Sequence, residues 1–377
     1  MRVLYVLNAT VMGGGNISLI NMLKGMHQRG VEIFIVYPDK EIDSEFYKET
    51  KEFVSGYYRT WMHAYFHPRI NNMSTKTKIK EKIKAFTEDF KINKIIKEVK
   101  PDIIHTNVGV IHTGYRCAAK NHIPHVWHLR EYQTKDFDCI IEPSYDKFVQ
   151  MVHQSNVITI TKDILKYFKL EDSNKATCIY NGCCSENDIC LDYPKEKYFL
   201  CCSRISKSKG HKEVVEAFVE FYKTHQDYKL IIAGFGDEEY IAELKAIVKN
   251  SHLEHAVQFV GYKDDVKPLM RKARALIVAS ACEGFGRMTA EAAFYGCLVI
   301  GKNSGGTKEI LENTGGFLYD NDVQGLIEKM NEVAQLNDEQ YKSMAMKAQA
   351  VAVKSYSNEQ NVENIYKLYS KLKKQES

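Results

Sequence analysis

The sequence predicts an α/β protein made of two Rossmann-like domains, each built on a parallel sheet. Short apolar runs of strand length alternate with helical segments along almost the whole chain, and this alternation is typical of parallel sheets with right-handed crossovers. The length of 377 residues suits two domains of ordinary size. A polar, charged segment near the middle, Ser185–Lys197, interrupts the alternation and is the predicted linker.

The first domain, residues 1–188, is predicted to open with a strand, a glycine-rich turn and a helix. Arg2–Leu7 is apolar, Asn8–Gly15 ends in three glycines, and Asn16–Gln28 has helical periodicity and stops before Gly30. This opening is typical of a Rossmann-like half. Further strands of the domain are expected at Glu32–Tyr37, Asp102–His105, His125–His128, Asn156–Ile160 and Ala176–Ile179.

The second domain, residues 196–356, is predicted to repeat this pattern. Its strands are expected at Tyr198–Cys202, Lys229–Ala233, Val257–Val260, Ala275–Ala279 and Cys297–Ile300, and its helices at Lys212–Thr224, Glu238–Lys249, Thr289–Tyr295, Val323–Leu336 and Asp338–Val353. A last amphipathic helix, Asn358–Leu372, lies in the remaining segment, residues 357–377.

Composition excludes several classes of protein. The net charge is only +4 and the lysines are spread along the chain, so we expect no nucleic-acid partner. No apolar run has the length of a membrane span. The apolar start, Met1–Leu7, is too short for a signal peptide. Without such a signal, the ten cysteines are expected to be reduced thiols in a cytoplasmic protein.

The most informative stretch is Ala275–Gly316. Glu283 is expected on the loop after one buried strand, and Glu291 lies eight residues on, in the first turns of the next helix. The backbone N–H groups of Phe285–Met288 would lie at the positive end of that helix, where anions bind. A second glycine-rich corner, Ser304–Thr307, opens the following helix. Two carboxylates beside two such helix starts suit a ligand with both hydroxyls and phosphates.

A basic pair follows the first strand of the second domain. Arg204 and Lys209 are five residues apart, and Gly210 comes directly after the lysine. On a loop between a strand and a helix, the two side chains can hold one diphosphate from two sides.

These motifs resemble glycosyltransferase family 4, group 1, whose members are retaining enzymes of the GT-B fold. The resemblance rests on seven residues between the two glutamates and on Glu283-Gly284-Phe285-Gly286, Glu291-Ala292, Gly296, Val299-Ile300, Gly305-Gly306, Glu309-Ile310 and the R-x4-K-G pattern at Arg204–Gly210. It implies two domains facing across a cleft, with the nucleotide sugar mainly on the second, the acceptor on the first and a C-terminal helix that packs back on the first.

The activity implied is sugar transfer from a nucleotide sugar, with UDP favoured, to a glycan or lipid-linked acceptor of surface-polysaccharide or glycolipid synthesis. The resemblance assigns catalytic roles to Arg204 and Lys209 on the diphosphate, to Glu283 on sugar hydroxyls and to His128 near the sugar. Glu283 as a covalent nucleophile is the alternative. The expected donor-binding residues are Gly14, Gly15, Gly234, Gly236, Lys263, Phe285, Gly286 and Glu291, the last of them on the ribose. Those expected near the acceptor are His105, Arg130 and Glu131.

No cofactor and no metal are expected, because Arg204, Lys209 and the helix starts supply the positive charge that a divalent metal would supply. Asp136-Phe137-Asp138 spells the D-x-D metal motif of a different glycosyltransferase fold, and we interpret it as incidental. For His105 and His128, and for the turn at Gly13–Gly15, a purely structural role stays open.

The lysine-dense segment Lys76–Lys100 has two interpretations. Ile79, Ile83, Phe86 and Phe90 fall near one side of a helix surrounded by lysines. The segment is either a solvated helix surface or a basic helix that contacts an anionic membrane or a lipid diphosphate. The second interpretation predicts peripheral contact with the inner membrane surface. For the whole chain, a non-catalytic transferase subunit and a sugar-nucleotide epimerase of the same fold remain as alternatives.

Overall fold

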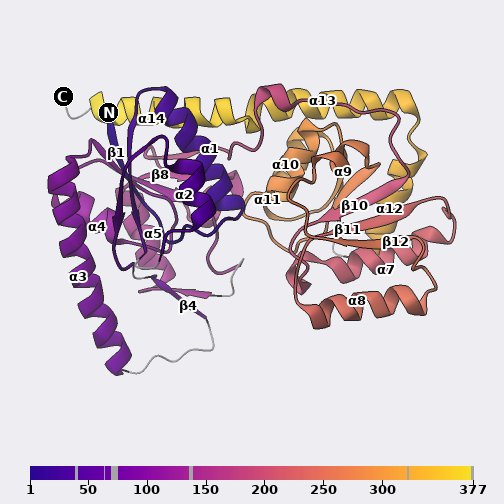
Figure 1. Ribbon diagram of the computed structural model, residues 1–377, viewed down its shortest axis with the longest axis horizontal. Helices are drawn as coiled ribbons and strands as arrows, with labels where there is room; N and C mark the ends of the chain where they lie inside the picture. Colours follow the sequence, from indigo (N-terminus) through magenta and orange to yellow (C-terminus); the bar gives the residue numbers. More distant parts are fainter. Residues whose placement is uncertain (39–40, 63, 69–74, 136–138, 321, 375–377) are drawn as a thin grey trace. The chain divides into compact units, whose positions relative to one another are not determined.

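The computed structural model describes residues 1–38, 41–62, 64–68, 75–135, 139–320 and 322–374, with the side chains of 67–68, 75–82 and 84 also left out (Figure 1). The chain forms two compact units. The first is Met1–Gly182 together with Asn358–Ser377, and the second is Cys183–Ser357.

The first unit is built on a parallel sheet. Among the described residues, seven strands pair in the order β3-β2-β1-β5-β6-β8-β9. They are β1 (Arg2–Val6), β2 (Glu32–Tyr37), β3 (Val54–Arg59), β5 (Ile103–Thr106), β6 (His125–Leu129), β8 (Asn156–Thr159) and β9 (Ala176–Cys178). The helices are α1 (Gly14–Gln28), α2 (Ser44–Thr50), α3 (Thr75–Val99), α4 (Thr113–Lys120), α5 (Tyr145–Gln154), α6 (Lys162–Tyr167) and α14 (Asn358–Lys374).

The second unit has a smaller sheet of the same type. Six strands of its described part pair in parallel in the order β12-β11-β10-β13-β14-β15. They are β10 (Tyr198–Cys202), β11 (Lys229–Ala233), β12 (Val257–Gly261), β13 (Ala275–Val278), β14 (Leu298–Lys302) and β15 (Phe317–Tyr319). The helices are α7 (His211–Tyr222), α8 (Glu238–Asn250), α9 (Lys267–Lys272), α10 (Arg287–Phe294), α11 (Gly305–Thr314), α12 (Val323–Gln335) and α13 (Asp338–Tyr356). The predicted class, two α/β domains with parallel sheets, is confirmed.

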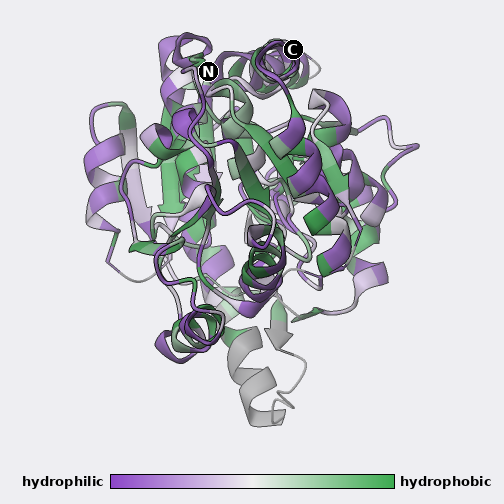
Figure 2. Ribbon diagram, turned by 90° about the vertical axis from the view of Figure 1, so that its right-hand side faces the viewer, coloured by the Kyte–Doolittle hydropathy of each residue, from purple (hydrophilic) through white to green (hydrophobic). Residues whose placement is uncertain are grey.

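The strands are nearly continuous apolar runs because helices cover both faces of each sheet. In Figure 2 the strands are mostly green, whereas the helices carry hydrophilic residues on their outer sides. In the first unit, Leu4 and Val6 of β1 belong to one core cluster, while Val3 and Tyr5 belong to the cluster on the other face. This alternation follows from the two-residue period of a strand.

The C-terminal helix α14 packs on α1 in the first unit, as predicted (Figure 1). Gly25 of α1 permits the close approach, since a Cβ at this position would lie 2.4 Å from a methyl group of Val362. Ile365 and Tyr369 of the same helix are fully buried in the core of the first unit.

The predicted linker is not a free connection. Residues 183–197 belong to the second unit, where the Cys190 amide donates to the carbonyl of Phe294 and the Glu196 amide donates to that of Lys272. The units divide at Gly182–Cys183 and at Ser357–Asn358, so the first division lies before the predicted segment. Polar composition identified a surface segment, but these backbone bonds assign it to the second unit.

Four strands of the described residues escaped the sequence analysis. The edge strand β3 carries Gly56 and few aliphatic residues, and β15 has only three residues. The antiparallel pair β4 (Phe66–Pro68) and β7 (Cys139–Ile141) forms between segments far apart in the chain. Within the described residues, no helix combines the length and apolar character that crossing a bilayer needs.

Candidate active site

A cavity of about 190 Å³ lies at the carboxyl ends of β10 and β13, which are neighbours in the sheet of the second unit. Arg204, Lys209 and Glu283 line it, together with Gly286 and other residues at the start of α10. Ligands of open parallel sheets bind at this edge. The structure therefore brings together three of the residues assigned to the diphosphate and the sugar.

Glycines hold the loop that carries Arg204. A Cβ on Gly234 would lie 1.9 Å from the carbonyl oxygen of Ser203, and one on Gly236 would lie 1.9 Å from that of Ile205. These two glycines thus pack against the protein's own backbone, and the donor contact predicted for them stays a prediction. Arg204 itself is exposed, and it has no ion pair with any residue of the described part of the chain.

Lys209 and Glu283 form an ion pair inside this cavity. The Lys209 Nζ lies 2.6 Å from the Glu283 Oε1, and the two side chains are 28% and 22% exposed. Gly210 permits this approach because its φ is +71° and a Cβ would lie 2.3 Å from the carbonyl oxygen of Ala279. A lysine ammonium has three N–H donors, so the pair leaves donors for a further oxygen ligand.

The glycine pair at the start of α11, Gly305 and Gly306, supports the loop that carries Glu283. The Gly306 amide donates to the Glu283 carbonyl at 2.8 Å. A Cβ on Gly305 would lie 2.6 Å from that oxygen, and one on Gly306 would lie 2.2 Å from the Phe285 carbonyl oxygen. The corner that the sequence analysis treated as an anion site is therefore also a packing contact.

Helix α10 begins at Arg287, directly after Gly286 at φ +87°. The hydroxyls of Thr289 and Thr307 lie 3.3 and 3.1 Å from the position of a Cβ on Gly286. Both hydroxyl oxygens are buried and find no hydrogen-bond partner among the described residues. Phe285 is buried against the ring of Tyr356, so its side chain anchors the loop and only its backbone can face the cavity.

Glu291 is not among the residues that line the cavity. Its carboxylate pairs with Arg287 at 2.5 Å, and the Arg287 Nη2 also donates to the Cys183 carbonyl at 3.0 Å. Burial raises the pKa of Glu291, and the facing guanidinium partly offsets the rise. Arg287, which the sequence analysis missed, lines the cavity instead. Its position four residues before Glu291, just ahead of the predicted helix Thr289–Tyr295, was the available signal.

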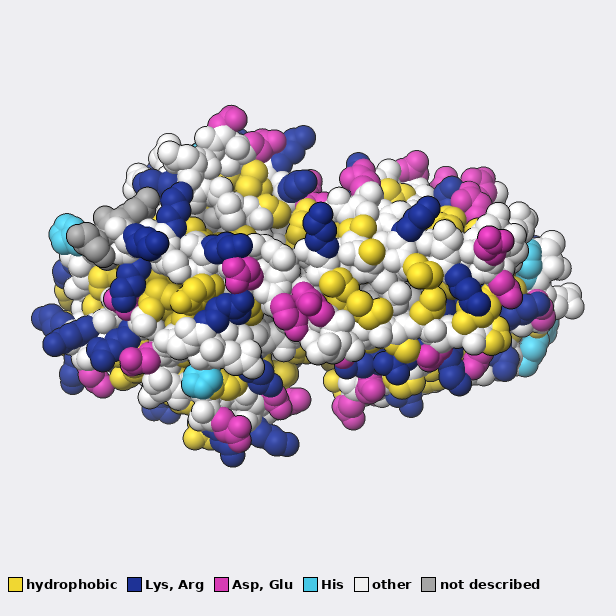
Figure 3. Space-filling model, turned by 90° about the horizontal axis from the view of Figure 1, so that it is seen from above, with side chains coloured by type: hydrophobic (Ala, Val, Ile, Leu, Met, Phe, Trp, Pro, Cys, Tyr) yellow, Lys and Arg dark blue, Asp and Glu magenta, His cyan; other side chains and the backbone are white. Residues whose placement is uncertain are grey.

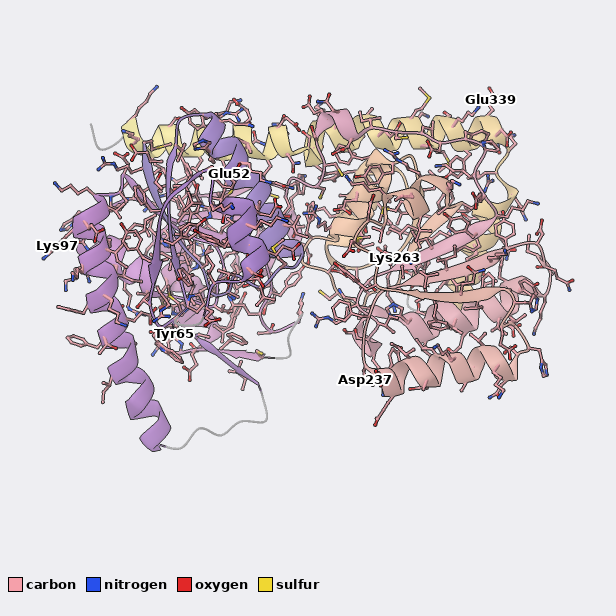
Figure 4. All side chains as sticks on the ribbon, viewed as in Figure 1. Glu52, Tyr65, Lys97, Asp237, Lys263 and Glu339 are labelled. Carbon is pink, nitrogen blue, oxygen red and sulfur yellow. The ribbon has the colours of Figure 1, made fainter. Side chains whose placement is uncertain are left out.

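Lys263 is exposed just beyond β12, where Figure 4 labels it. Beside it, Tyr262 and Phe235 are 63% and 59% exposed, with ring centroids 5.7 Å apart. These two aromatic side chains follow the adjacent strands β12 and β11. They form an exposed aromatic pair beside Lys263.

His105 and His128 come together in the first unit. The two side chains are fully buried near the carboxyl ends of β5 and β6, and His105 Nε2 lies 3.2 Å from His128 Nδ1. Burial lowers the pKa of both imidazoles well below the usual value, and the nearby Arg130 lowers both further. Both histidines are therefore neutral at physiological pH.

Arg130 is buried, and its guanidinium donates to Asn107 Oδ1 at 3.0 Å and to Asn181 Oδ1 at 2.7 Å. These bonds turn the guanidinium toward the interior of the unit. Glu131 lies nearer the surface, and its Oε1 accepts from the Gly109 amide at 3.4 Å. An acceptor contact of either residue stays a prediction.

The glycine turn Gly13–Gly15 leads into α1, which begins at Gly14, two residues before the predicted start. The Asn16 side chain holds the turn by donating to the carbonyls of Ala9 and Val11. No atom lies within 4 Å of a Cβ on Gly13 or Gly15 among the described residues. This open space is compatible with the predicted approach of a ligand to Gly15, and the contact predicted for Gly14 stays a prediction.

Among the described residues, no group of three or more His, Cys, Asp or Glu side chains is arranged to hold a metal ion. The D-x-D sequence at 136–138 lies outside the described residues.

Over the face shown in Figure 3, Lys and Arg side chains are interspersed with Asp and Glu.

Two family models match the chain, Glycosyltransferase Family 4 over residues 12–186 and Glycosyl transferases group 1 over residues 191–351. The chain is 28% identical over 176 residues to N-acetyl-alpha-D-glucosaminyl L-malate synthase of Bacillus anthracis, which covers 46% of this chain and 45% of that protein. The match thus spans less than half of that relative's length.

Two further similarities cover more of the chain. It is 25% identical over 273 residues, 70% of this chain and 72% of the relative, to the Campylobacter jejuni GalNAc-alpha-(1->4)-GalNAc-alpha-(1->3)-diNAcBac-PP-undecaprenol alpha-1,4-N-acetyl-D-galactosaminyltransferase. A crystal structure of Anabaena HepE in complex with UDP superposes with a TM-score of 0.81 at 19% identity, covering 98% of this chain and 100% of that one.

The structural likeness concerns the fold, and the family models concern the sequence. The two models lie on the two units in the same order along the chain. The chain belongs to glycosyltransferase family 4, group 1, and its fold is of the GT-B type.

Proposed function

We propose that this chain is a retaining glycosyltransferase. It would move a hexose or N-acetylhexosamine from a UDP-sugar to a glycan or lipid-linked acceptor in surface-polysaccharide or glycolipid synthesis. The observation that carries the proposal is the cavity of the second unit, where Arg204 and Lys209 lie with Glu283 and with the residues at the start of α10. Cations, amide donors and a carboxylate in one cavity match the phosphates and hydroxyls of a sugar nucleotide.

The diphosphate would bind between Arg204 and Lys209. These two side chains would supply the positive charge that a divalent metal supplies in other enzymes. Lys209 keeps one N–H on Glu283 and directs its other donors to a phosphate oxygen. Both cations then stabilise the charge that develops on the phosphate as the bond to the sugar breaks. This ion pair holds the Glu283 carboxylate in place, and the carboxylate orients the sugar by accepting hydrogen bonds from the sugar hydroxyls.

Retention follows if the acceptor hydroxyl attacks on the face that the diphosphate leaves. Its proton passes to the departing phosphate oxygen, so the protein supplies no nucleophile. The ion pair supports this role for Glu283, because a carboxylate bound to an ammonium at 2.6 Å is a poorer nucleophile than a free one. Glu291 would hold the ribose, with Arg287 fixing the carboxylate until the nucleotide binds.

The choice of UDP is supported by HepE, whose crystal structures include complexes with UDP and with UDP-glucose. The exposed pair Phe235 and Tyr262 suits a nucleotide base, since bases stack on aromatic side chains. The Campylobacter jejuni relative, by its name, acts on an undecaprenol diphosphate, which supports a lipid-linked acceptor here.

Contact with a membrane is part of this proposal. On α3, the described side chains Ile83, Phe86 and Phe90 are 61%, 77% and 72% exposed and lie on one stripe of the helix. The exposed Lys94 and Lys97 continue this stripe toward the end of the helix, where Figure 4 labels Lys97.

The opposite side of α3 is buried through Ile92, Ile96 and other core residues. An apolar stripe beside lysines suits the surface of an anionic bilayer. The lysines at 76, 78, 80, 82 and 84 have side chains outside the described residues.

Thermal unfolding of the purified chain with UDP, GDP, ADP, UDP-glucose, UDP-N-acetylglucosamine and GDP-mannose tests the donor. A ligand at one hundred times its Kd stabilises the native state by about 2.7 kcal/mol. We expect UDP and one UDP-sugar to raise Tm, with no effect of GDP or ADP. Stabilisation by GDP alone would contradict the choice of UDP, and no stabilisation by any of the six would contradict the function.

A second measurement separates transfer from binding. Slow hydrolysis of the stabilising UDP-sugar is followed by proton NMR of the released sugar. We expect free sugar that first appears with the anomeric configuration of the donor. Binding without turnover would indicate a non-catalytic subunit, and an epimerised sugar nucleotide would indicate an epimerase.

A further inference from the structure

A chain of hydrogen-bonding groups links the C-terminal helix to His128. The Tyr369 hydroxyl, on α14, lies 2.6 Å from His105 Nδ1, although 264 positions separate the two residues in sequence. His105 Nε2 lies 3.2 Å from His128 Nδ1. At the other end, the Tyr5 hydroxyl on β1 lies 3.3 Å from that of Tyr369. All four side chains are fully buried, so water does not compete for these contacts.

Arg130 sets the direction in which this chain donates. Its Nη2 lies 3.4 Å from His128 Nδ1, and a guanidinium has only N–H donors. Burial lowers the pKa of Arg130 only to about 10, so the side chain stays charged at neutral pH. His128 Nδ1 must therefore accept, because a proton on that nitrogen would face the N–H groups of Arg130.

The other contacts then follow in order. If His128 Nδ1 accepts, His105 Nε2 carries the proton and donates to it. His105 Nδ1 is then without a proton and accepts from the Tyr369 hydroxyl at 2.6 Å. The single hydrogen of that hydroxyl is then directed to His105 rather than to the Tyr5 oxygen, which lies 3.3 Å away. In the reverse order, His128 Nδ1–H would donate to His105, and the contact with Arg130 would join two donors. Only the first direction leaves the Arg130 guanidinium facing an acceptor.

The outcome is a defined proton on the far side of the His128 ring. A neutral imidazole without a proton on Nδ1 carries it on Nε2. His128 Nε2 is buried, and it has no hydrogen-bond partner among the described residues. Unsatisfied buried polar atoms are uncommon in native proteins and call for a physical explanation. The N–H group at His128 Nε2 is therefore suited to donate a hydrogen bond to an oxygen atom of a bound ligand.

We propose that Tyr369 is a positioning residue: through His105 it holds neutral His128 in the Nε2–H tautomer, ready to donate to an oxygen atom of a bound ligand. The identity of the acceptor oxygen rests on the proposed function, whereas the tautomer does not. The final helix thus does more than cover the first unit, because one of its hydroxyls fixes the proton on a residue assigned to the reaction.

Nitrogen NMR of the full chain, labelled on histidine and free of ligand, tests this proposal. Protonated and unprotonated imidazole nitrogens resonate far apart, and the His105→Gln and His128→Gln variants assign the signals. We expect His128 with the proton on Nε2 and His105 with the proton on Nε2. A proton on His128 Nδ1 in the wild type would overturn the proposal, whatever the substrate proves to be.

Tyr369→Phe keeps the ring and removes the hydroxyl. The loss of one buried hydrogen bond is expected to raise the minor tautomer of His105 about fivefold and to shift the His128 signals with it. His125 is an internal reference, since Thr106 and Ser155 hold it apart from this chain of contacts. Tyr366→Phe, on the same helix, is the matched control and should leave all three signals unchanged. If Tyr369→Phe leaves His105 and His128 as in the wild type, Tyr369 has no positioning role.

Discussion

Lys209→Met is the substitution that the proposed donor site predicts most sharply. The lysine ammonium lies in the cavity, 2.6 Å from Glu283 and 28% exposed. A hydrogen bond to a charged group contributes about 1.5–3 kcal/mol, so UDP should bind about 10- to 150-fold more weakly. The effect on stability should be small, because an ion pair that solvent still reaches contributes about 1 kcal/mol and methionine keeps most of the side-chain volume.

Isothermal titration of UDP into the wild type, Lys209→Met and Lys207→Met gives the result. Lys207 is the matched control, since it is exposed two residues earlier and does not line the cavity. Part of the loss should come from Glu283, which repels phosphate once its partner is gone. Lys209→Met with Glu283→Gln should therefore bind UDP better than Lys209→Met alone. A Kd for Lys209→Met within twofold of the wild type would refute the diphosphate assignment.

Three further outcomes follow from the structure. Gly210→Ala should destabilise the second unit by more than Gly315→Ala, as measured by urea unfolding. Both positions have positive φ, so both variants carry a backbone strain of about 1–2 kcal/mol, but only at Gly210 does a carbonyl oxygen lie 2.3 Å from the new Cβ. Equal losses of stability in the two variants would contradict the packing argument. The stability of the first unit should also depend on pH. Burial lowers the pKa of His125 to about 3, and it lowers the pKa values of His105 and His128 well below the usual value. The unfolded chain, with histidine near 6.5, then binds more protons, so stability is constant above that pH and falls below it, by about 1.4 kcal/mol per histidine at pH 5.5. Tryptophan fluorescence should show this fall, since Trp61 and Trp127 both lie in the first unit, and a urea midpoint that does not fall from pH 7.5 to 5.5 would contradict it. Phe86→Ser with Phe90→Ser should abolish cosedimentation with phosphatidylglycerol vesicles, whereas Met346→Ser on α13, 61% exposed in the wild type, should not; no binding of the wild type to these vesicles would contradict the membrane contact.

Periodicity predicted the regular elements well where a strand is both buried and bounded by turns. β2, β10 and β11 begin and end at the predicted residues, because each contains an unbroken apolar run bounded by polar residues. The prediction for α10 began at Thr289, two residues late. The first turn of that helix contains the charged Arg287, which packs on Glu291 rather than in the core, and apolar periodicity does not detect such a residue.

The site was predictable in part for the same physical reason. Arg204, Lys209 and Glu283 follow strands, and strands that are neighbours in a parallel sheet bring their loops to one edge. The packing roles of Gly234 and Gly236 were not visible, since a glycine in sequence does not indicate whether a ligand or the protein's own backbone comes close. The contact of Tyr369 with His105 was also not visible, because it depends on where α14 lies along the first sheet.

A crystal structure of this chain grown with UDP tests the central claim most directly. We predict that the two phosphates lie in the cavity at the ends of β10 and β13, within hydrogen-bond distance of the Arg204 guanidinium and the Lys209 ammonium. Bound UDP with its phosphates away from both side chains would contradict the account.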